Sequence, residues 1–154
     1  MRFSLAAALA LLTGSSLPAQ TNQNTPDLAT AAPIAGNWTY VATADGSEAT
    51  FSNSSNFPQL WVHCRRAARR VSIAKAAAVA APQISVWTSA LARSVAASFN
   101  PATGRLTIDL DANDPLLDAL SNSRGRIAFT VASEPALVVP AWAEPARVVE
   151  DCRG

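Results

Sequence analysis

One histidine and two cysteines are the residues of this 154-residue chain that most clearly could carry out chemistry. His63 directly precedes Cys64, and a thiol held beside an imidazole can act as an activated nucleophile. Cys64 and Cys152 could instead form a disulfide, the common outcome for two cysteines in an oxidising compartment. Because adjacent residues of a strand point to opposite faces, the side chains of His63 and Cys64 should diverge, and we expect the disulfide.

A single histidine also limits metal and serine chemistry. A histidine-cluster zinc site is excluded, and a serine triad would have to use His63. The segment Asp109–Asp114 has oxygen ligands at alternate positions, as a calcium loop does, but its sixth residue is not glycine and its twelfth is Leu120 instead of glutamate. We interpret it as a strand end followed by a helix cap, and we expect neither a metal nor another cofactor.

Two arginines and one tryptophan form the candidate binding surface. Arg124 and Arg126 flank a turn glycine and could grip a carboxylate or phosphate in a forked geometry. The alternative is a helix-to-strand turn whose arginines neutralise nearby acidic residues. Trp142, between Pro140 and Pro145, is the one of the four tryptophans that we most expect to be exposed. We therefore take Arg124, Arg126 and Trp142 together as the candidate surface.

Four more arginines lie in the sequence RRAARR at residues 65–70. Such a run could bind an anionic partner such as lipid A, a polyanion or an acidic protein surface. It could also be a solvated turn that the acidic C-terminal segment neutralises. The expected disulfide would bring Arg65 and Arg66 beside the dipeptide Glu150-Asp151, so we favour the second interpretation.

Three carboxylates near the end of the chain are the candidates for catalysis. Glu144, Glu150 and Asp151 could supply an acid pair for glycoside cleavage. Their spacing is not specific to that reaction, and we assign no catalytic residue.

The first 19 residues have the layout of a cleavable secretory signal. A basic start is followed by an apolar run over residues 3–12 and by a small, polar stretch that ends near Ala19. The apolar run is too short to span a bilayer, which disfavours the alternative of an uncleaved membrane anchor. Cleavage after Ala19 or after Ala32 would leave a periplasmic or secreted protein that does not span the membrane.

The length and charge of the remaining chain indicate its domain organisation and the kind of partner it can bind. Residues 20–33 are polar, small and interrupted by proline, which is typical of a flexible leader, and residues 34–154 suit a single domain. Without the first 20 residues, 11 basic and 11 acidic residues remain. This balance argues against a nucleic-acid partner, because phosphate binding needs a basic surface. We expect a monomer.

Short apolar runs separated by turn residues predict strands from residue 34 onward. Asp114-Pro115 is a typical helix start, with an N-cap followed by proline in the first turn. Residues 144–152 form either a second helix or an extended end. We predict a mainly β fold, a β-sandwich or partly closed barrel of seven to nine strands with one or two short helices and one disulfide. The nine candidate strands are Asn37–Ala42, Glu48–Ser52, Gln59–Cys64, Arg70–Lys75, Gln83–Ser89, Ser94–Asn100, Arg105–Asp109, Arg126–Ala132 and Ala136–Val139.

Alternation of apolar and polar residues assigns the faces of these strands. Cys64 falls on the core side, where a buried disulfide would lie. The residues expected to point inward are Leu60, Val62, Cys64, Val71, Ile73, Leu106, Ile108, Leu110, Ile127, Phe129 and Val131.

Three segments resemble small exported proteins of alphaproteobacteria that carry no assigned function. These segments are Asp114–Leu120, Ser123–Arg126 and Arg147–Arg153, and the resemblance extends from about Pro33 to the end. An exported, strand-rich domain with an early tryptophan and one long-range disulfide is also similar in layout to invasion-associated locus B proteins. The resemblance implies an alphaproteobacterial periplasm and transfers no functional residue.

The sequence therefore favours an exported, periplasmic, non-enzymatic module that binds a protein or an envelope component. One alternative is a small hydrolase that uses the C-terminal carboxylates. The other is a structural or stress-related envelope protein, which a surface without any groove would favour.

Overall fold

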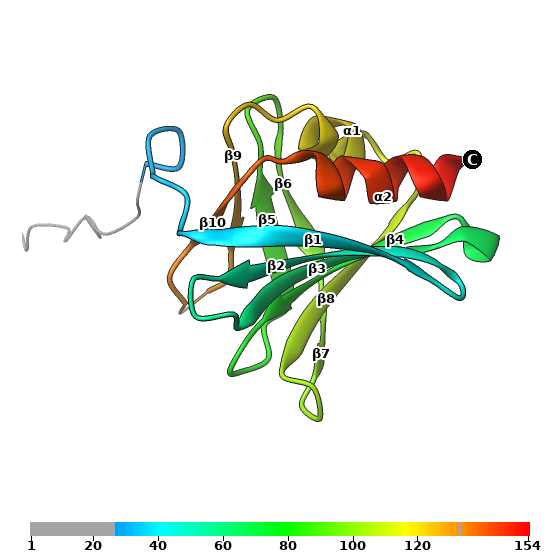
Figure 1. The fold of residues 1–154 in the computed structure, drawn as a ribbon. Coiled ribbons are helices and arrows are strands. Elements are labelled where there is room, and N and C mark those ends of the chain that lie inside the picture. Colours follow the sequence, from blue (N-terminus) through cyan, green and yellow to red (C-terminus); the bar gives the residue numbers. More distant parts are fainter. Residues whose placement is uncertain (1–26, 133) are drawn as a thin grey trace, which may run out of the picture.

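The computed structural model describes residues 27–132 and 134–154. The expected signal peptide and a cleavage site after Ala19 lie outside these residues. The described chain forms ten strands in two antiparallel sheets, together with two α-helices (Figure 1). The mainly β fold predicted from the sequence is confirmed.

The larger sheet has six strands in the order β1-β2-β3-β4-β8-β7. Its first four strands are consecutive antiparallel neighbours. A short 3-10 turn over Arg66–Ala68 joins β3 to β4, and Arg69 closes this turn in the left-handed conformation with φ 49°. The strands are β1 Gly36–Thr43, β2 Gly46–Asn53, β3 Pro58–Arg65, β4 Arg70–Ala76, β7 Ser98–Asn100 and β8 Arg105–Asp111.

The smaller sheet has four strands in the order β10-β9-β5-β6. The single strand expected at Ser94–Asn100 is in fact two strands, so the structure has one strand more than the upper limit of our prediction. The chain bends at Ala97, whose N–H donates to the carbonyl of Pro82 (2.9 Å), and it crosses from the smaller sheet to the larger one there. The strands are β5 Gln83–Trp87, β6 Ala92–Ala96, β9 Arg126–Thr130 and β10 Leu137–Pro140.

The two sheets do not close into a barrel, and their arrangement is consistent with a sandwich. Near β10, the indole N–H of Trp38 donates to the carbonyl of Pro140 (2.9 Å), and the N–H of Ile34 donates to the carbonyl of Val138 (2.9 Å). These bonds hold the start of β1 against the smaller sheet without continuing a ladder between the sheets.

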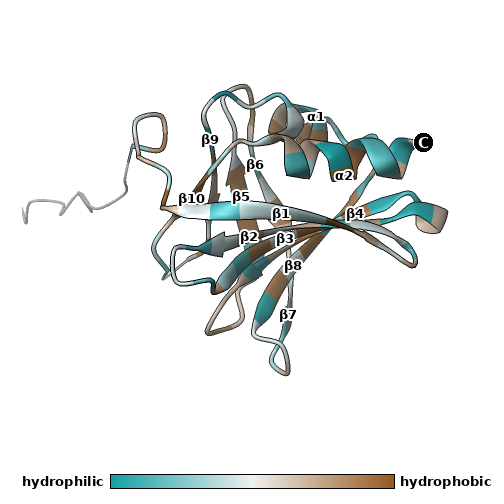
Figure 2. Ribbon diagram, in the orientation of Figure 1, coloured by the Kyte–Doolittle hydropathy of each residue, from teal (hydrophilic) through white to brown (hydrophobic). Residues whose placement is uncertain are grey.

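The core lies between the sheets and is filled by alternate strand residues. Hydrophobic and hydrophilic residues alternate along α2 and several strands (Figure 2). Every residue that the alternation predicted to point inward is buried, which confirms the assignment of the faces. The largest fully buried side chains include Phe51 and Phe129, one from each sheet.

Helix α1 spans Pro115–Ser121 and helix α2 spans Ala143–Arg153. Asp114 caps α1 as predicted, because its Oδ1 accepts a hydrogen bond from the N–H of Leu116 (2.8 Å). The second expected helix also forms. It packs against β2, β3 and α1, as Figure 1 shows, and it buries Val148, Val149 and Cys152.

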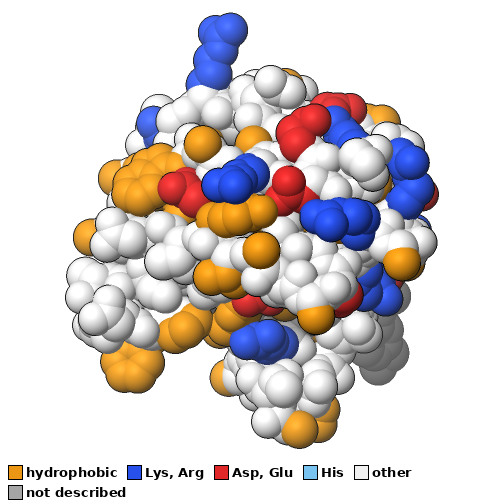
Figure 3. Space-filling model, turned by 45° about the vertical axis from the view of Figure 1, so that its right-hand side comes forward, with side chains coloured by type: hydrophobic (Ala, Val, Ile, Leu, Met, Phe, Trp, Pro, Cys, Tyr) orange, Lys and Arg blue, Asp and Glu red, His pale blue; other side chains and the backbone are white. Residues whose placement is uncertain are grey.

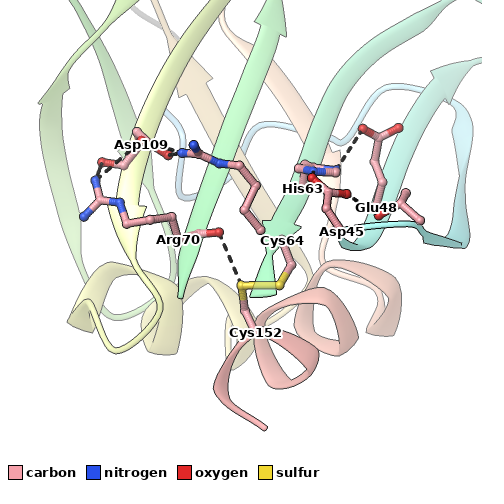
Figure 4. A network of polar contacts seen from close by, with 9 residues as sticks. Asp45, Glu48, His63, Cys64, Arg70, Asp109 and Cys152 are labelled. Atoms are coloured by element: carbon pink, nitrogen blue, oxygen red, sulfur yellow. Dashed lines mark hydrogen bonds and ion pairs between the residues drawn. A yellow bond between two sulfur atoms is a disulfide. The ribbon is translucent and has the colours of Figure 1, made fainter. Parts of the chain in front are cut away.

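A disulfide joins Cys64 at the end of β3 to Cys152 on α2, as predicted (Figure 4). Both residues are buried, and their Cα atoms lie 5.4 Å apart. The expectation that Arg65 would meet the C-terminal acids is wrong: Arg65 pairs with Asp109 on β8 at 2.8 Å. Strand alternation explains this, because Cys64 points inward to α2 and the next residue must then point to the outer face.

The segment before β1 contacts the smaller sheet. Residues 27–33 belong to the stretch expected to be a flexible leader. The carbonyl of Ala31 accepts a hydrogen bond from Arg126 Nη1 (2.7 Å), and Leu28 lines a hollow of about 220 Å³ with residues of β5 and β6. In this structure the segment therefore lies against the outer face of that sheet.

The contact between β6 and α1 should make stability depend on acid pH. Arg93 Nη2 donates to both carboxylate oxygens of Asp114 (2.7 and 2.8 Å). Burial by itself raises the pKa of Asp114, but the hydrogen bonds from Arg93 and from the Leu116 N–H, with the arginine charge, outweigh it and lower that pKa below 3.8. The stabilisation is therefore complete well above pH 3.8 and is lost as the pH falls through the lower, folded value.

Asp114→Asn should lower the free energy of unfolding at pH 7 by about 1–2 kcal/mol, because asparagine still caps the helix but loses the charged pair. Urea denaturation between pH 7 and pH 2 measures this effect, and the variant should depend less on pH than the wild type. Asp111→Asn is the control, because Asp111 caps a turn through the N–H of Asn113 (2.9 Å) and forms no ion pair in the described part of the chain. An equal pH dependence in wild type and Asp114→Asn would contradict the prediction.

Candidate functional site

The structure brings the backbones of the predicted surface residues to one end of the smaller sheet. Arg126 pairs with Pro140 in the ladder between β9 and β10, and the N–H of Ala141 donates to the carbonyl of Gly125 (3.3 Å). Trp142 is 45% exposed, as expected. Arg126, however, donates to the carbonyl of Ala31, so one of its donors is already used.

The alternative for these arginines, that they neutralise nearby acids, is not what the structure contains. Asp114 pairs with Arg93, whereas Asp118 and Glu150 both pair with Arg153. Arg124 is exposed and forms no ion pair with any residue of the described chain. One arginine of the predicted surface is therefore held by the N-terminal segment, and the other is exposed to solvent.

The basic run at residues 65–70 is bound to neighbouring elements. Asp109 lies 2.8 Å from Arg65 and 3.6 Å from Arg70 (Figure 4), while Arg66 and Arg69 donate to backbone carbonyls near the end of α2 (both 3.3 Å). Figure 3 views the side of the molecule that carries this end of α2, and basic and acidic side chains are interspersed over it. A solvated turn held by its own chain is the better description of this run.

A groove that the sequence did not predict lies on the outer face of the larger sheet. It has a volume of about 340 Å³ and crosses β2, β3, β4 and β8 to the turn between β7 and β8. We call it the sheet groove. Its lining residues are Glu48, Trp61, His63, Ser72, Ala74, Asn100, Thr103, Arg105 and Thr107.

Strand register explains why these residues meet. Glu48, His63 and Ser72 are successive partners across β2, β3 and β4, and they form one row of outward side chains. Trp61, Ala74 and Thr107 form the next row, across β3, β4 and β8. The small side chain of Ala74 leaves a hollow between its two larger neighbours, which places the floor of the groove on β4.

An unpaired arginine lies over this floor. The Arg105 guanidinium carbon is 3.7 Å from the centre of the Trp61 ring, a cation–π contact between β8 and β3. These strands are separated by β4, so the contact crosses about 10 Å of sheet, and Ala74 is small enough to permit it. Arg105 forms neither an ion pair nor a side-chain hydrogen bond within the part of the chain that the structure describes.

A histidine between two carboxylates forms the other end of the groove (Figure 4). His63 Nε2 lies 3.1 Å from Asp45 Oδ2, and Nδ1 lies 3.5 Å from Glu48 Oε2. The Thr43 hydroxyl donates to Asp45 (2.8 Å), and this bond, followed by the contact with His63, lowers the pKa of Asp45. The imidazole is thus oriented by Glu48 of β2 and by Asp45 of the turn that joins β1 to β2.

This arrangement does not assemble a nucleophile. Ser72 is the ladder partner of His63, but the two side chains form no hydrogen bond, and both imidazole nitrogens face carboxylates instead. A serine activated by histidine needs that hydrogen bond. Cys64 lies in the disulfide and offers no thiol.

The C-terminal carboxylates are spread along α2. Glu150 pairs with Arg153 (3.3 Å), and Asp151 accepts a hydrogen bond from the Tyr40 hydroxyl (2.6 Å), which is the main cause of the lowered pKa of Asp151. None of the four principal cavities in the described residues is lined by Glu144, Glu150 or Asp151. The acid pair considered for glycoside cleavage is therefore not placed in one of these cavities.

The segment Asp109–Asp114 is a strand end and a helix cap, as we interpreted it. Asp109 pairs with arginines, Asp111 caps a turn, and Asp114 caps α1. No cluster of three or more histidine, cysteine, aspartate or glutamate side chains suited to a metal ion occurs in residues 27–132 and 134–154.

A buried ion pair was also missed. Lys75, the one lysine of the chain, points into the sandwich after Val71 and Ile73, and its Nζ lies 2.5 Å from Glu134 Oε2. A lysine that continues an inward alternation was a local signal for this site. Its partner lies 59 residues away, so no local pattern indicated it.

Comparisons with known proteins do not add to these observations. No family model, curated protein or solved structure matches this chain. The helices in the described residues have 7 and 11 residues, and neither is long and apolar enough to span a membrane. A functional assignment therefore depends on the chemistry of the surfaces described above.

Proposed function

We propose that this chain is an exported, non-enzymatic binding module that holds a component of the cell envelope in the sheet groove. The observation that carries the proposal is Arg105, which lies over Trp61 without an acidic partner in the described chain. The signal-like N-terminus and the buried disulfide support export to the periplasm, because structural disulfides occur mainly in oxidising compartments.

Two features favour binding over catalysis. The groove presents hydrogen-bonding groups on regular strands, and neither Ser72 nor Cys64 is arranged as a nucleophile. The existence of a groove also favours a binding role over a purely structural one.

Capture of envelope material on the immobilised mature protein tests the proposal. Glu48→Gln combined with Arg105→Gln should lower the captured amount at least about tenfold, because it removes both charged groups that can form strong hydrogen bonds in the groove. The variant should keep the urea midpoint of the wild type within a small margin, since both residues lie on the outer face of the sheet.

Arg124→Ala combined with Arg126→Ala is the matched control, because it also removes charge but leaves the groove intact. It should capture as much as the wild type. Loss of capture in this control, with full capture by the groove variant, would place the contact at Arg124, Arg126 and Trp142 and would overturn the assignment to the groove. Equal capture by all proteins would do the same.

A further inference from the structure

Arg105 differs from the other arginines on the same face of the larger sheet. Arg65 and Arg70 share the carboxylate of Asp109, whereas Arg105 has no carboxylate within ion-pair distance in the described residues. Trp61 supports one face of its guanidinium group and so restricts its orientation. The N–H groups at the edge of the guanidinium can donate in parallel to two oxygens of a carboxylate or phosphate. This end of the groove therefore fits an acid group.

Glu48 gives the opposite end of the groove a different preference. One of its carboxylate oxygens accepts from the Thr50 hydroxyl (3.3 Å), and the other lies 3.5 Å from His63 Nδ1. The carboxylate retains lone pairs for further donors, because each of its oxygens can accept more than one hydrogen bond. Hydroxyl donors of a ligand can therefore complete the surroundings of this carboxylate.

Uncharged polar side chains line the rest of the groove. Ser72 lies in the row of Glu48 and Thr107 in the row of Trp61, whereas Asn100 lies beside Arg105 and Thr103 in the turn beyond it. The backbones of Glu48 and Arg105 are two rows apart, about 13 Å along the strands, but the Arg105 guanidinium group reaches back to Trp61 in the row between them. A volume of about 340 Å³ lies near the lower end of the range for small-molecule sites, which suits about one or two sugar rings.

From this arrangement we infer that the sheet groove binds an anionic saccharide, a sugar unit that carries a carboxylate or a phosphate. The acid group contacts Arg105, and hydroxyl groups of the ring donate to Glu48. The inference deepens the proposed function and rests on it, since it names the chemical class of the envelope component.

Isothermal titration of the purified, disulfide-bonded protein tests this ligand class. The probes are glucuronic acid, galacturonic acid and glucose 6-phosphate, with glucose, acetate and inorganic phosphate as partial ligands. At least one acidic sugar should bind about tenfold or more tightly than glucose and than either free anion, because only the acidic sugars contact both ends of the groove. Comparison of the uronic acids with the sugar phosphate identifies the acid group.

Three variants locate the bound sugar. Arg105→Gln should weaken binding of the preferred acidic sugar about 10- to 100-fold, the range expected for loss of a charged hydrogen-bonding pair. Arg105→Lys keeps the charge without the fork and should recover only part of the affinity. Ala74→Leu fills the floor of the groove without removing a polar group and should also weaken binding. Arg147→Gln removes a similar arginine–aromatic contact, with Tyr40, outside the groove and should not weaken binding.

Three results would overturn the inference: glucose binding as tightly as every acidic sugar, an affinity that Arg105→Gln leaves unchanged, or no binding by any of the acidic sugars. None of them decides the proposed function. Capture of envelope material that still depends on Glu48 and Arg105 would then identify a groove whose ligand is not an anionic saccharide.

Discussion

Replacement of Cys64 and Cys152 together by alanine should lower the free energy of unfolding by about 4–5 kcal/mol. The disulfide closes a loop between residues 88 apart, and the entropy that such a closure removes from the unfolded chain corresponds to about that value. The loss is a large fraction of the about 5–15 kcal/mol that stabilises a typical domain. Urea denaturation of the variant and of the oxidised wild type measures it.

Because the disulfide is attached to α2, its loss should affect this helix most. Cys152 lies on α2, which also buries Val148 and Val149 against the larger sheet, so loss of the disulfide should loosen this helix first. Hydrogen exchange of the α2 amides reports that change. The reduced wild type is the control and should match the alanine variant.

Mass spectrometry should find both cysteines in one intramolecular bond in the exported protein. Free thiols or a covalent dimer in that sample would contradict the pairing. Identical urea midpoints for oxidised and reduced wild type would show that the bond does not stabilise the fold.

Glu134→Ala should lower the free energy of unfolding by about 3–5 kcal/mol, which is the cost of leaving a buried charge without its partner. Lys75 is only 6% exposed, and besides Glu134 its ammonium group has one acceptor in the described chain, the carbonyl of Ala76 (3.0 Å). Glu134 also accepts from the N–H of Ala78 (3.2 Å), so the variant loses this bond as well. Thermal and urea denaturation measure the loss.

Two controls separate the buried charge from other effects. Lys75→Met combined with Glu134→Gln should recover most of the loss, because no charge then remains inside the sandwich. Asp118→Ala removes a pair with Arg153 whose aspartate is 55% exposed, and it should cost no more than about 1 kcal/mol. A Glu134→Ala protein as stable as the wild type would mean that water reaches Lys75.

Local patterns were sufficient for most of the secondary structure. Alternation in segments such as Val71–Ile73 and Leu106–Leu110 assigned the buried faces correctly, since a strand has a period of two residues whatever its neighbours are. Asp114-Pro115 predicted the start of α1, because an N-cap and a first-turn proline favour a helix through contacts with residues close in sequence. The single strand predicted at Ser94–Asn100 is interrupted at Ala97, where the chain passes from the smaller sheet to the larger one. The sequence of this segment does not show which sheet each half joins, so the interruption could not be predicted from it.

The disulfide could also be predicted from the sequence, because two cysteines allow only one intramolecular pairing. The sequence did not predict the partners of the charged residues. Arg65 was expected beside the C-terminal acids, but it pairs with Asp109, because its outward direction and the neighbouring strands decide what it can meet.

The amino-acid pattern alone was enough to predict a β-rich chain, the buried faces of β3, β4, β8 and β9, and the bond between Cys64 and Cys152. Strand order and register, which arise from packing the two sheets on one core, then decided which outward residues became neighbours. Arg105 can reach Trp61 across β4 because the register places the small residue Ala74 beneath the contact. Outward residues carry no hydrophobic period that marks their partners, so the sheet groove exists only in the folded protein.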